Sequence, residues 1–168
     1  MVITSKFVRS TTPRPLNDEE RSWALRALDA NHTATEHIRR RAVERCLLIP
    51  TNPSVRHVRG LRSAIANLSL ANRASGITMG RKVFIREELF GPNAEVDLRL
   101  VVHEVTHVVQ FMRDGFVTFI TRYLNDYAEG RARGLSDYDA YLAIGYEQEA
   151  RAVEDFVRRH AYTGPRSL

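Results

Sequence analysis

The stretch VVHEVTHVVQF, residues 101–111, combines three side chains that can do chemistry with a spacing that brings them together. His103 and His107 are four residues apart, so on an α-helix they lie one turn apart on the same face and can bind one ion. Glu104 then lies beside them. Apolar residues, mostly valine, occupy the neighbouring positions, which is typical of a helix inside a protein core. The stretch therefore predicts a buried helix that carries a metal site.

The residue types in this helix favour zinc. Imidazole nitrogen is a preferred zinc ligand, and zinc with one open position lowers the pKa of a bound water to about 7. A neighbouring carboxylate can take the proton, so we expect Zn2+ held by His103 and His107, with Glu104 as general base. The H-E-x-x-H pattern is specific only on a helix that is followed by a third ligand. Otherwise it is a chance pentapeptide with hydrogen-bonded core histidines.

The third ligand is expected in GYEQEARAVEDF, residues 145–156, on a helix that folds back against the first. Glu147 is favoured because Glu147 and Ala150 reproduce E-x-x-A, in which the small residue lets two helices approach closely. Glu149, which points about 200° away, is the alternative ligand. Glu154 shares the face of Glu147 two turns later. We expect it to accept a hydrogen bond from the remaining ring N–H of a ligand histidine.

Length and composition favour one domain. The chain has 168 residues and 43% hydrophobic content, enough for a continuous core. We expect a flexible arm over residues 1–16, where Pro13 and Pro15 oppose helix, and a single domain over residues 17–168. Cys46 is the single cysteine, so no internal disulfide can form. The N-terminus lacks the apolar stretch of a signal peptide, so we expect synthesis in the cytoplasm, with non-classical export left open.

The positive charge does not point to nucleic acid. The net charge is +5 and the sequence pI is about 9.8, which would suit a polyanionic partner. However, the arginines are scattered along the chain, and the dense run over residues 39–45 has no aromatic ladder that could stack bases. We expect no nucleic-acid partner and no membrane-spanning segment.

Periodicity and turn residues predict an α+β fold, mostly helical, with a small hairpin beside the motif helix. The hairpin is expected at Ile77–Met79 and Val83–Ile85, and Val83–Arg86 is expected to be the sheet edge that binds an extended peptide. His57, in an expected strand, is a further but weaker candidate for the third ligand. Helices are expected over 18–30, 33–48, 61–72, 116–128 and 136–162, with a strand as the alternative for 61–72. The last helix is capped by Ser136 and interrupted at Gly145, and a strand is expected over 54–60 and a loop over 130–134.

Three stretches together carry a resemblance: SGITMGRKVFI, LRLVVHEVTHVVQF and YEQEARAVEDF. They resemble the zincin-like domain linked to extracellular contractile injection systems, over about residues 54–156. The resemblance implies a gluzincin-type metallopeptidase fold, with His103, His107 and Glu147 as metal ligands and Glu104 as base. It also implies an injection-system assembly as a partner.

One residue departs from the pattern of this family. Arg151 stands where relatives usually have an aspartate that orients a ligand histidine. The departure bears on activity more than on metal binding, and Glu154 is the candidate replacement.

We therefore expect a zinc metalloendopeptidase that hydrolyses peptide bonds in a protein or peptide substrate. Tyr138 and Tyr141, one turn apart before the ligand helix, are candidate donors to the oxyanion. The second hypothesis, motivated by Arg151, is a zinc-binding scaffold or interaction module of the same fold with little catalytic activity. A basic nucleic-acid binder is the weakest hypothesis.

Overall fold

The predicted α+β class is confirmed in the computed structural model, which describes residues 12–51 and 75–161. The expected strand over 54–60, the expected helix over 61–72 and His57 lie outside these residues. The elements in chain order are β1 (Arg14–Pro15), α1 (Asp18–Asn31), α2 (Glu36–Arg45), β2 (Leu47–Thr51), β3 (Gly76–Met79), β4 (Lys82–Arg86), the 3-10 turn η1 (Glu87–Leu89), α4 (Leu98–Asp114), α5 (Phe116–Ala132), α6 (Asp137–Leu142) and α7 (Gly145–His160).

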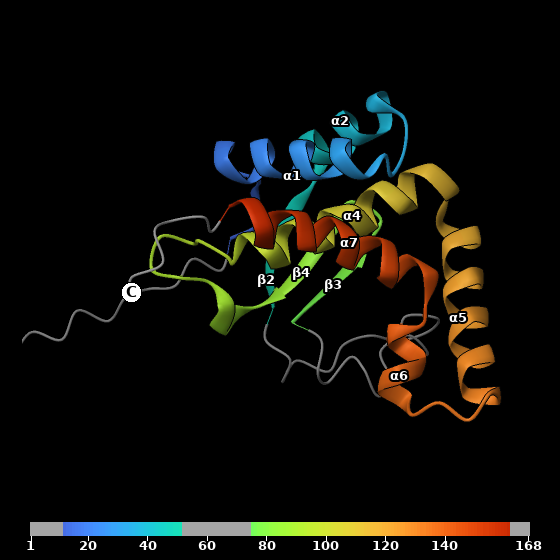
Figure 1. Cartoon of the computed structure of the whole chain (residues 1–168). Helices are drawn as coiled ribbons and strands as arrows, with labels where there is room; N and C mark the ends of the chain where they lie inside the picture. The colour runs from blue at the N-terminus through green and yellow to red at the C-terminus, as the bar shows by residue number, and fades with distance from the viewer. Residues whose placement is uncertain (1–11, 52–74, 162–168) are drawn as a thin grey trace, which may run out of the picture.

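Helix α4 lies at the centre of the fold. It contacts α7, α1, α2, β3 and α5, and Figure 1 shows α4 and α7 side by side between the α1–α2 pair and the sheet. Every residue from Val101 to Phe111 is buried, as the all-round apolar pattern predicted. No glycine or proline interrupts the helix until Gly115, whose φ of 80° ends it. The motif helix is therefore held on all sides.

Helix α7 runs antiparallel to α4. Gln110, near the end of α4, contacts Tyr146 at the start of α7, whereas His103 contacts Glu154 two turns further along α7. Ala150 is fully buried between these contacts, in keeping with the close helix approach that E-x-x-A predicted. The antiparallel packing brings the polar faces of both helices together.

The sheet corrects the expected edge strand. Its order is β1-β2-β4-β3, with β2 and β4 parallel and β3 and β4 antiparallel. The hairpin was placed correctly, but Val83–Arg86 belongs to β4, which has a strand on each side. The prediction was wrong because residues 47–48 were counted as the end of a helix and no strand was expected over residues 49–51, whereas α2 ends at Arg45 and Leu47–Thr51 forms β2. Among the described strands, β3 is the edge beside α4.

The N-terminal segment is held by one arginine. Arg14 donates to the Ala94 carbonyl oxygen at 3.0 and 2.8 Å and to both carboxylate oxygens of Glu20 at 2.7 Å. Glu20 also closes a capping box with Asn17 at the start of α1. Leu16 is buried, so residues 14–16 belong to the sheet and the core rather than to the arm expected over residues 1–16.

Helix α5 is longer than predicted. It continues to Ala132, through most of the segment expected as a loop over residues 130–134. A glycine occurs inside the helix because a Cβ at Gly130 would lie 3.0 Å from the Ala140 Cβ atom on α6. Gly130 lets α6 approach, and Gly134, with φ of 84°, makes the turn. Ser136 caps α6 as expected, accepting from the Asp139 N–H.

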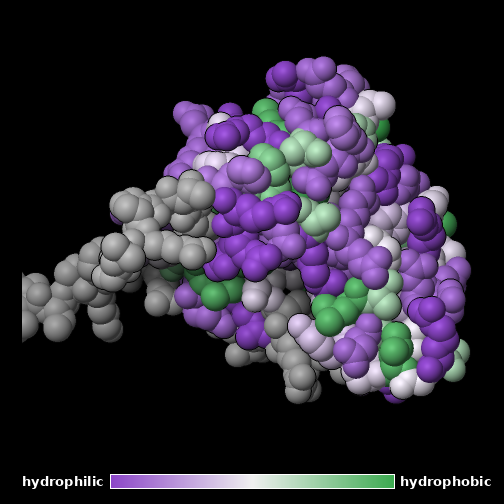
Figure 2. Space-filling view, in the orientation of Figure 1, coloured by the Kyte–Doolittle hydropathy of each residue, from purple (hydrophilic) through white to green (hydrophobic). Residues whose placement is uncertain are grey.

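The surface in Figure 2 is largely hydrophilic, with apolar residues in small separate groups. Within the described ranges, no helix is long and apolar enough to cross a membrane. Large apolar side chains are exposed at Ile77, Leu89, Phe116, Val117 and Tyr138. Three of them, Ile77, Leu89 and Tyr138, line one cleft of about 800 Å³. That volume is in the range of ligand sites, and an apolar rim is typical of one.

Candidate metal centre

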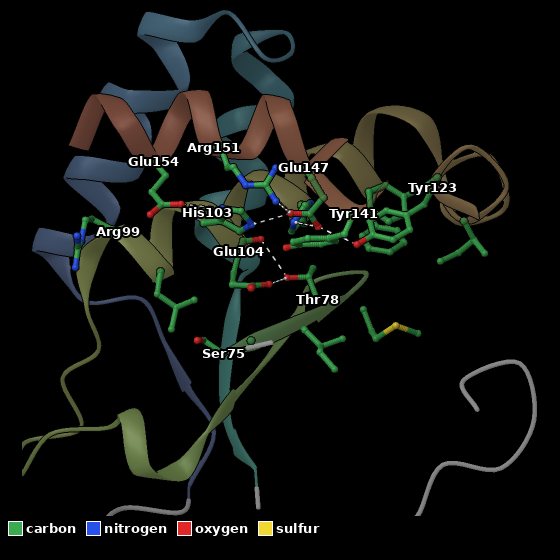
Figure 3. Close-up of a pocket in the computed structure, with 18 of the residues that line it drawn as sticks. Ser75, Thr78, Arg99, His103, Glu104, Tyr123, Tyr141, Glu147, Arg151 and Glu154 are labelled. Atoms are coloured by element: carbon green, nitrogen blue, oxygen red, sulfur yellow. Dashed lines mark hydrogen bonds and ion pairs between the residues drawn. The ribbon is translucent and has the colours of Figure 1, made fainter. Parts of the chain in front are cut away.

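The floor of this cleft holds the three residues predicted as metal ligands. His103, His107 and Glu147 are buried, and each offers one ligand atom within 4.8 Å of the others. The Nε2 atoms of His103 and His107 each lie 3.4 Å from an oxygen of Glu147. Figure 3 shows the side chains of His103 and Glu147 pointing toward one another. Among the candidates for the third ligand that the structure describes, Glu147 is the one that lies against both histidines.

The spacing suits a metal better than direct hydrogen bonds. A separation of 3.4 Å is longer than the ~2.7–3.2 Å of a good N–H···O bond. Zinc bonds to imidazole nitrogen and carboxylate oxygen are about 2.0–2.2 Å, so one ion can be reached by three ligand atoms that lie within 4.8 Å of one another, as these do. The donor set, two imidazoles and one carboxylate, is also one that zinc accepts. These residues therefore fit a zinc ion.

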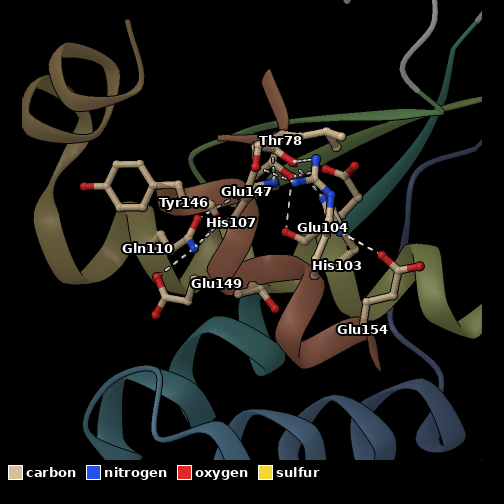
Figure 4. Close-up of polar contacts among 12 residues, drawn as sticks. Thr78, His103, Glu104, His107, Gln110, Tyr146, Glu147, Glu149 and Glu154 are labelled. Atoms are coloured by element: carbon tan, nitrogen blue, oxygen red, sulfur yellow. Dashed lines mark hydrogen bonds and ion pairs between the residues drawn. The ribbon is translucent and has the colours of Figure 1, made fainter. Parts of the chain in front are cut away.

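The other ring nitrogens have acceptors of their own (Figure 4). His103 Nδ1 lies 3.1 Å from Glu154 Oε2, as the sequence predicted, and His107 Nδ1 lies 2.7 Å from Gln110 Oε1. The Gln110 amide donates to the Tyr146 carbonyl at 3.0 Å, so its oxygen must face His107. Both rings thus donate from Nδ1. Both Nε2 atoms face Glu147, where either a proton or a metal ion can bind them.

The carboxylates around the two histidines stabilise a positive charge between them. Burial lowers the pKa of His103, but the carboxylates of Glu147 and Glu154 outweigh burial and raise it to about 10. Burial raises the pKa of Glu147, but the two histidines outweigh burial and hold that pKa well below its usual range. The carboxylate is therefore ionised at neutral pH, and a cation, whether a proton or a metal ion, is stabilised beside it.

Glu149, the alternative ligand, has a structural role instead. Its carboxylate accepts from Arg113 at 2.6 Å and from the Gln110 amide at 2.9 Å. Arg113 in turn binds Asp114 and the Thr33 carbonyl oxygen. Glu149 points away from the metal ligands, as its 200° offset predicted, and it ties α7 to the end of α4.

Glu104 faces the sheet edge. The Thr78 hydroxyl on β3 donates to Glu104 Oε2 at 2.7 Å. The β3 backbone comes so close that a Cβ at Gly76 would lie 2.7 Å from Glu104 Oε1. Glycine thus makes room for the carboxylate next to the strand. Thr78 was missed as a site residue because nothing in a hairpin sequence tells which helical residue it will meet.

Tyrosines of α5 and α6 close the other side of the cleft. The Tyr123 hydroxyl donates to Glu147 Oε1 at 2.9 Å, and burial and the Glu147 carboxylate raise the pKa values of Tyr123 and Tyr141. Both remain protonated donors at neutral pH. Tyr138, the other predicted donor, also lines the cleft but is 58% exposed. Tyr123 has no sequence signal apart from its place on an amphipathic helix.

An aromatic cluster fixes α5 in this position. Phe119 stacks between Phe111 of α4, at 3.9 Å between ring centroids, and Tyr146 of α7, at 4.4 Å. Tyr123 follows Phe119 by one turn, so the same packing that holds α5 aims the Tyr123 hydroxyl at Glu147.

Comparison with known proteins finds one matching family, over part of the chain. The family model described as the eCIS core domain matches residues 51–115, a span that contains Thr78, His103, Glu104 and His107 and ends before α5, α6 and α7. Searches of curated proteins and of solved structures each find no match. The match covers less than half of the chain, and it links the chain to extracellular contractile injection systems, consistent with an injection-system assembly as its setting.

Proposed function

We propose that this chain is a zinc-dependent metallopeptidase of the gluzincin type. The observation that carries the proposal is the arrangement of His103, His107 and Glu147. Their three ligand atoms lie within 4.8 Å of one another, and both histidine Nδ1 atoms have acceptors, so that each Nε2 faces Glu147. A carboxylate one residue after the first histidine, in a cleft open to ligands, adds the group that peptide hydrolysis needs.

Each residue then has a chemical task. Zinc would supply the Lewis acid that makes a water molecule reactive at neutral pH. Glu104 accepts a proton from that water as it attacks the scissile carbonyl, and returns the proton to the leaving amine. Tyr141, a neutral phenol that lines the cleft, would donate to the oxyanion that develops.

The edge strand β3 is the proposed platform for the substrate. Among the described strands it pairs only with β4, and residues 75–79 line the cleft next to Glu104. An extended peptide can add to such an edge through backbone hydrogen bonds, which places its amide groups along the cleft. Apolar side chains on the opposite wall, including Ile120 and Leu124, favour substrates with an apolar residue near the cleaved bond.

The test separates metal binding from turnover. We expect stoichiometric zinc in the wild-type protein and zinc-dependent cleavage of casein or a peptide library. Glu104→Gln should keep the zinc and lose cleavage by about a hundredfold or more, since it removes the general base. Glu147→Gln should lose the zinc itself, and Glu129→Gln on the exposed face of α5 is the matched control. A Glu104→Gln protein that cleaves as fast as the wild type would contradict the mechanism.

The second candidate function is a metal-binding scaffold with little turnover. The observation that favours it is Arg151, a cation 3.5 Å from the Glu147 carboxylate, where it competes with the metal for negative charge. Stoichiometric zinc without any metal-dependent cleavage would select this function over the peptidase.

A further inference from the structure

Arg151 is held inside the cleft without a strong partner of its own. It lies one turn after Glu147 on α7, and its Nη1 donates to the Leu142 carbonyl oxygen at 3.2 Å. Its guanidinium carbon lies 4.9 Å from the centre of the Tyr141 ring, a cation–π distance. The side chain is 30% exposed and lines the cleft. Arg151 is thus fixed in direction and still reachable by a ligand.

The position of Arg151 is not explained by a role in holding the metal ligands in place. Arg151 Nη2 is 3.5 Å from Glu147 Oε2, whereas charged hydrogen bonds are usually about 2.7–2.9 Å. Tyr123 already binds the other Glu147 oxygen at 2.9 Å, and Glu154 already orients His103. A guanidinium beside a cation site also opposes binding of a divalent ion. At this position Arg151 opposes metal binding, and the metal ligands do not need it to hold their orientation.

The chemistry of the guanidinium indicates what it is for. Arginine presents planar, paired N–H donors that match a carboxylate or another anionic oxygen. The second arginine of the cleft, Arg99, is engaged with Asp97 at 2.6 Å. In Figure 3 the Arg151 guanidinium lies beside Glu147 and above Tyr141, near His103. An anionic oxygen that enters the cleft next to the metal ligands therefore meets Arg151.

We propose that Arg151 is a substrate-binding residue that holds an anionic oxygen of a peptide ligand beside His103, His107 and Glu147. The proposal rests on the proposed function, because it takes a peptide as the ligand. The oxygen has two possible sources with the same chemistry. One is the carbonyl that becomes anionic during hydrolysis and ends as the carboxylate of the product. The other is the C-terminal carboxylate of the substrate.

A matched ligand pair tests the binding step without turnover. N-acetyl-L-phenylalanine and its amide differ only in the carboxylate, and their ring suits the apolar wall of the cleft. Titration calorimetry on the zinc-loaded protein should show tighter binding of the acid. Arg151→Gln should weaken acid binding about tenfold or more and leave amide binding unchanged, as expected for loss of a charged hydrogen bond. Arg151→Lys keeps the charge but not the paired donors, so its affinity for the acid should lie between those of the wild type and Arg151→Gln.

The control is Arg158→Gln, the same charge change on the same helix. Arg158 is 62% exposed and pairs with Asp155 on the surface. Equal acid affinity in the Arg151→Gln and Arg158→Gln proteins would overturn the proposal. So would a loss of zinc affinity in Arg151→Gln alone, because Arg151 would then serve Glu147. Thermal melting of each variant shows whether it is folded.

Cleavage of peptides with a free or an amidated C-terminus separates the two sources. If Arg151 binds the C-terminal carboxylate, amidation lowers kcat/KM in the wild type and not in Arg151→Gln. If it binds oxygen at the cleaved bond, Arg151→Gln lowers kcat/KM for both peptides equally. A wild-type protein that cleaves neither peptide would refute the proposed peptidase function, while the acid and amide titrations would still decide the role of Arg151.

Discussion

Glu154→Ala should weaken zinc binding while leaving the fold intact. Glu154 Oε2 lies 3.1 Å from His103 Nδ1, on the side of the ring away from Glu147. The variant removes both the acceptor that fixes the ring and a negative charge near the metal ligands. The Glu154 side chain is 35% exposed, so water can fill the space that it leaves.

The size of the effect follows from these contacts. Loss of an acceptor behind a ligand histidine usually lowers metal affinity about 10–100-fold, which corresponds to about 1.4–2.7 kcal/mol. Stability without zinc should fall by less than about 1 kcal/mol, the usual contribution of a partly exposed ion pair. Glu154→Gln keeps an acceptor and loses the charge, so its zinc affinity should lie between those of the wild type and Glu154→Ala.

Competition for zinc against a chromophoric chelator measures the affinities, and thermal melting with and without zinc measures stability. Asp155→Ala is the control, because Asp155 is the next residue on α7, carries the same charge and pairs with Arg158 at the surface at 3.1 Å. If Glu154→Ala binds zinc as tightly as Asp155→Ala, Glu154 does not support the site, and the role derived for it is wrong.

Three further variants probe the surroundings of the site. Thr78→Val removes the donor to Glu104 and should slow peptide cleavage about tenfold in a kinetic assay, whereas Thr78→Ser should not. Asp114→Asn removes the negative charge that faces Arg113 and one of the two oxygens that accept from it, and should destabilise the protein by about 1–2 kcal/mol in urea titration at pH 7. The Arg113 hydrogen bond lowers the pKa of Asp114, so the contribution of Asp114 is present above the unfolded pKa of about 4 and is lost as pH falls through the lower folded value. The wild type and Asp114→Asn should therefore converge in stability at acid pH, and a constant difference would contradict the pairing. Gly130→Ala would bring a Cβ within 3.1 Å of the α6 backbone and should cost about 1–3 kcal/mol in the same titration, and an unchanged midpoint would contradict the packing.

The predicted site residues that the structure brings together are those whose spacing follows from one helical periodicity. His103 and His107 share a helix face because of their spacing alone, and Glu147 and Glu154 share a face of α7 for the same reason. These pairs need only the assumption that two helices pack with their polar faces together. The structure brings all four together, and it places Glu149 outside the metal ligands.

The predictions that failed needed contacts between distant segments. Leu47 continues the apolar spacing of α2, but Leu47–Thr51 forms a strand because β4 lies alongside it. The addition of β2 moved the free edge of the described sheet from Val83–Arg86 to β3. Gly130 similarly looked like a loop residue, and only α6 shows why a glycine occurs inside a helix there. No local sequence pattern shows that β4 lies beside Leu47–Thr51 or that α6 packs against Gly130.

The direction of α7 also explains why the departure at Arg151 does not leave His103 without support. Because α7 runs antiparallel to α4, a residue that follows Glu147 on α7 faces a residue that precedes His107 on α4. Glu154, two turns after Glu147, therefore reaches His103, one turn before His107, and Gln110, after His107, reaches back to Tyr146. Arg151 lies between these contacts, where its side chain meets Glu147 and the cleft. An aspartate is thus not required at position 151 for the histidines to be oriented, and the arginine there is available to bind a ligand.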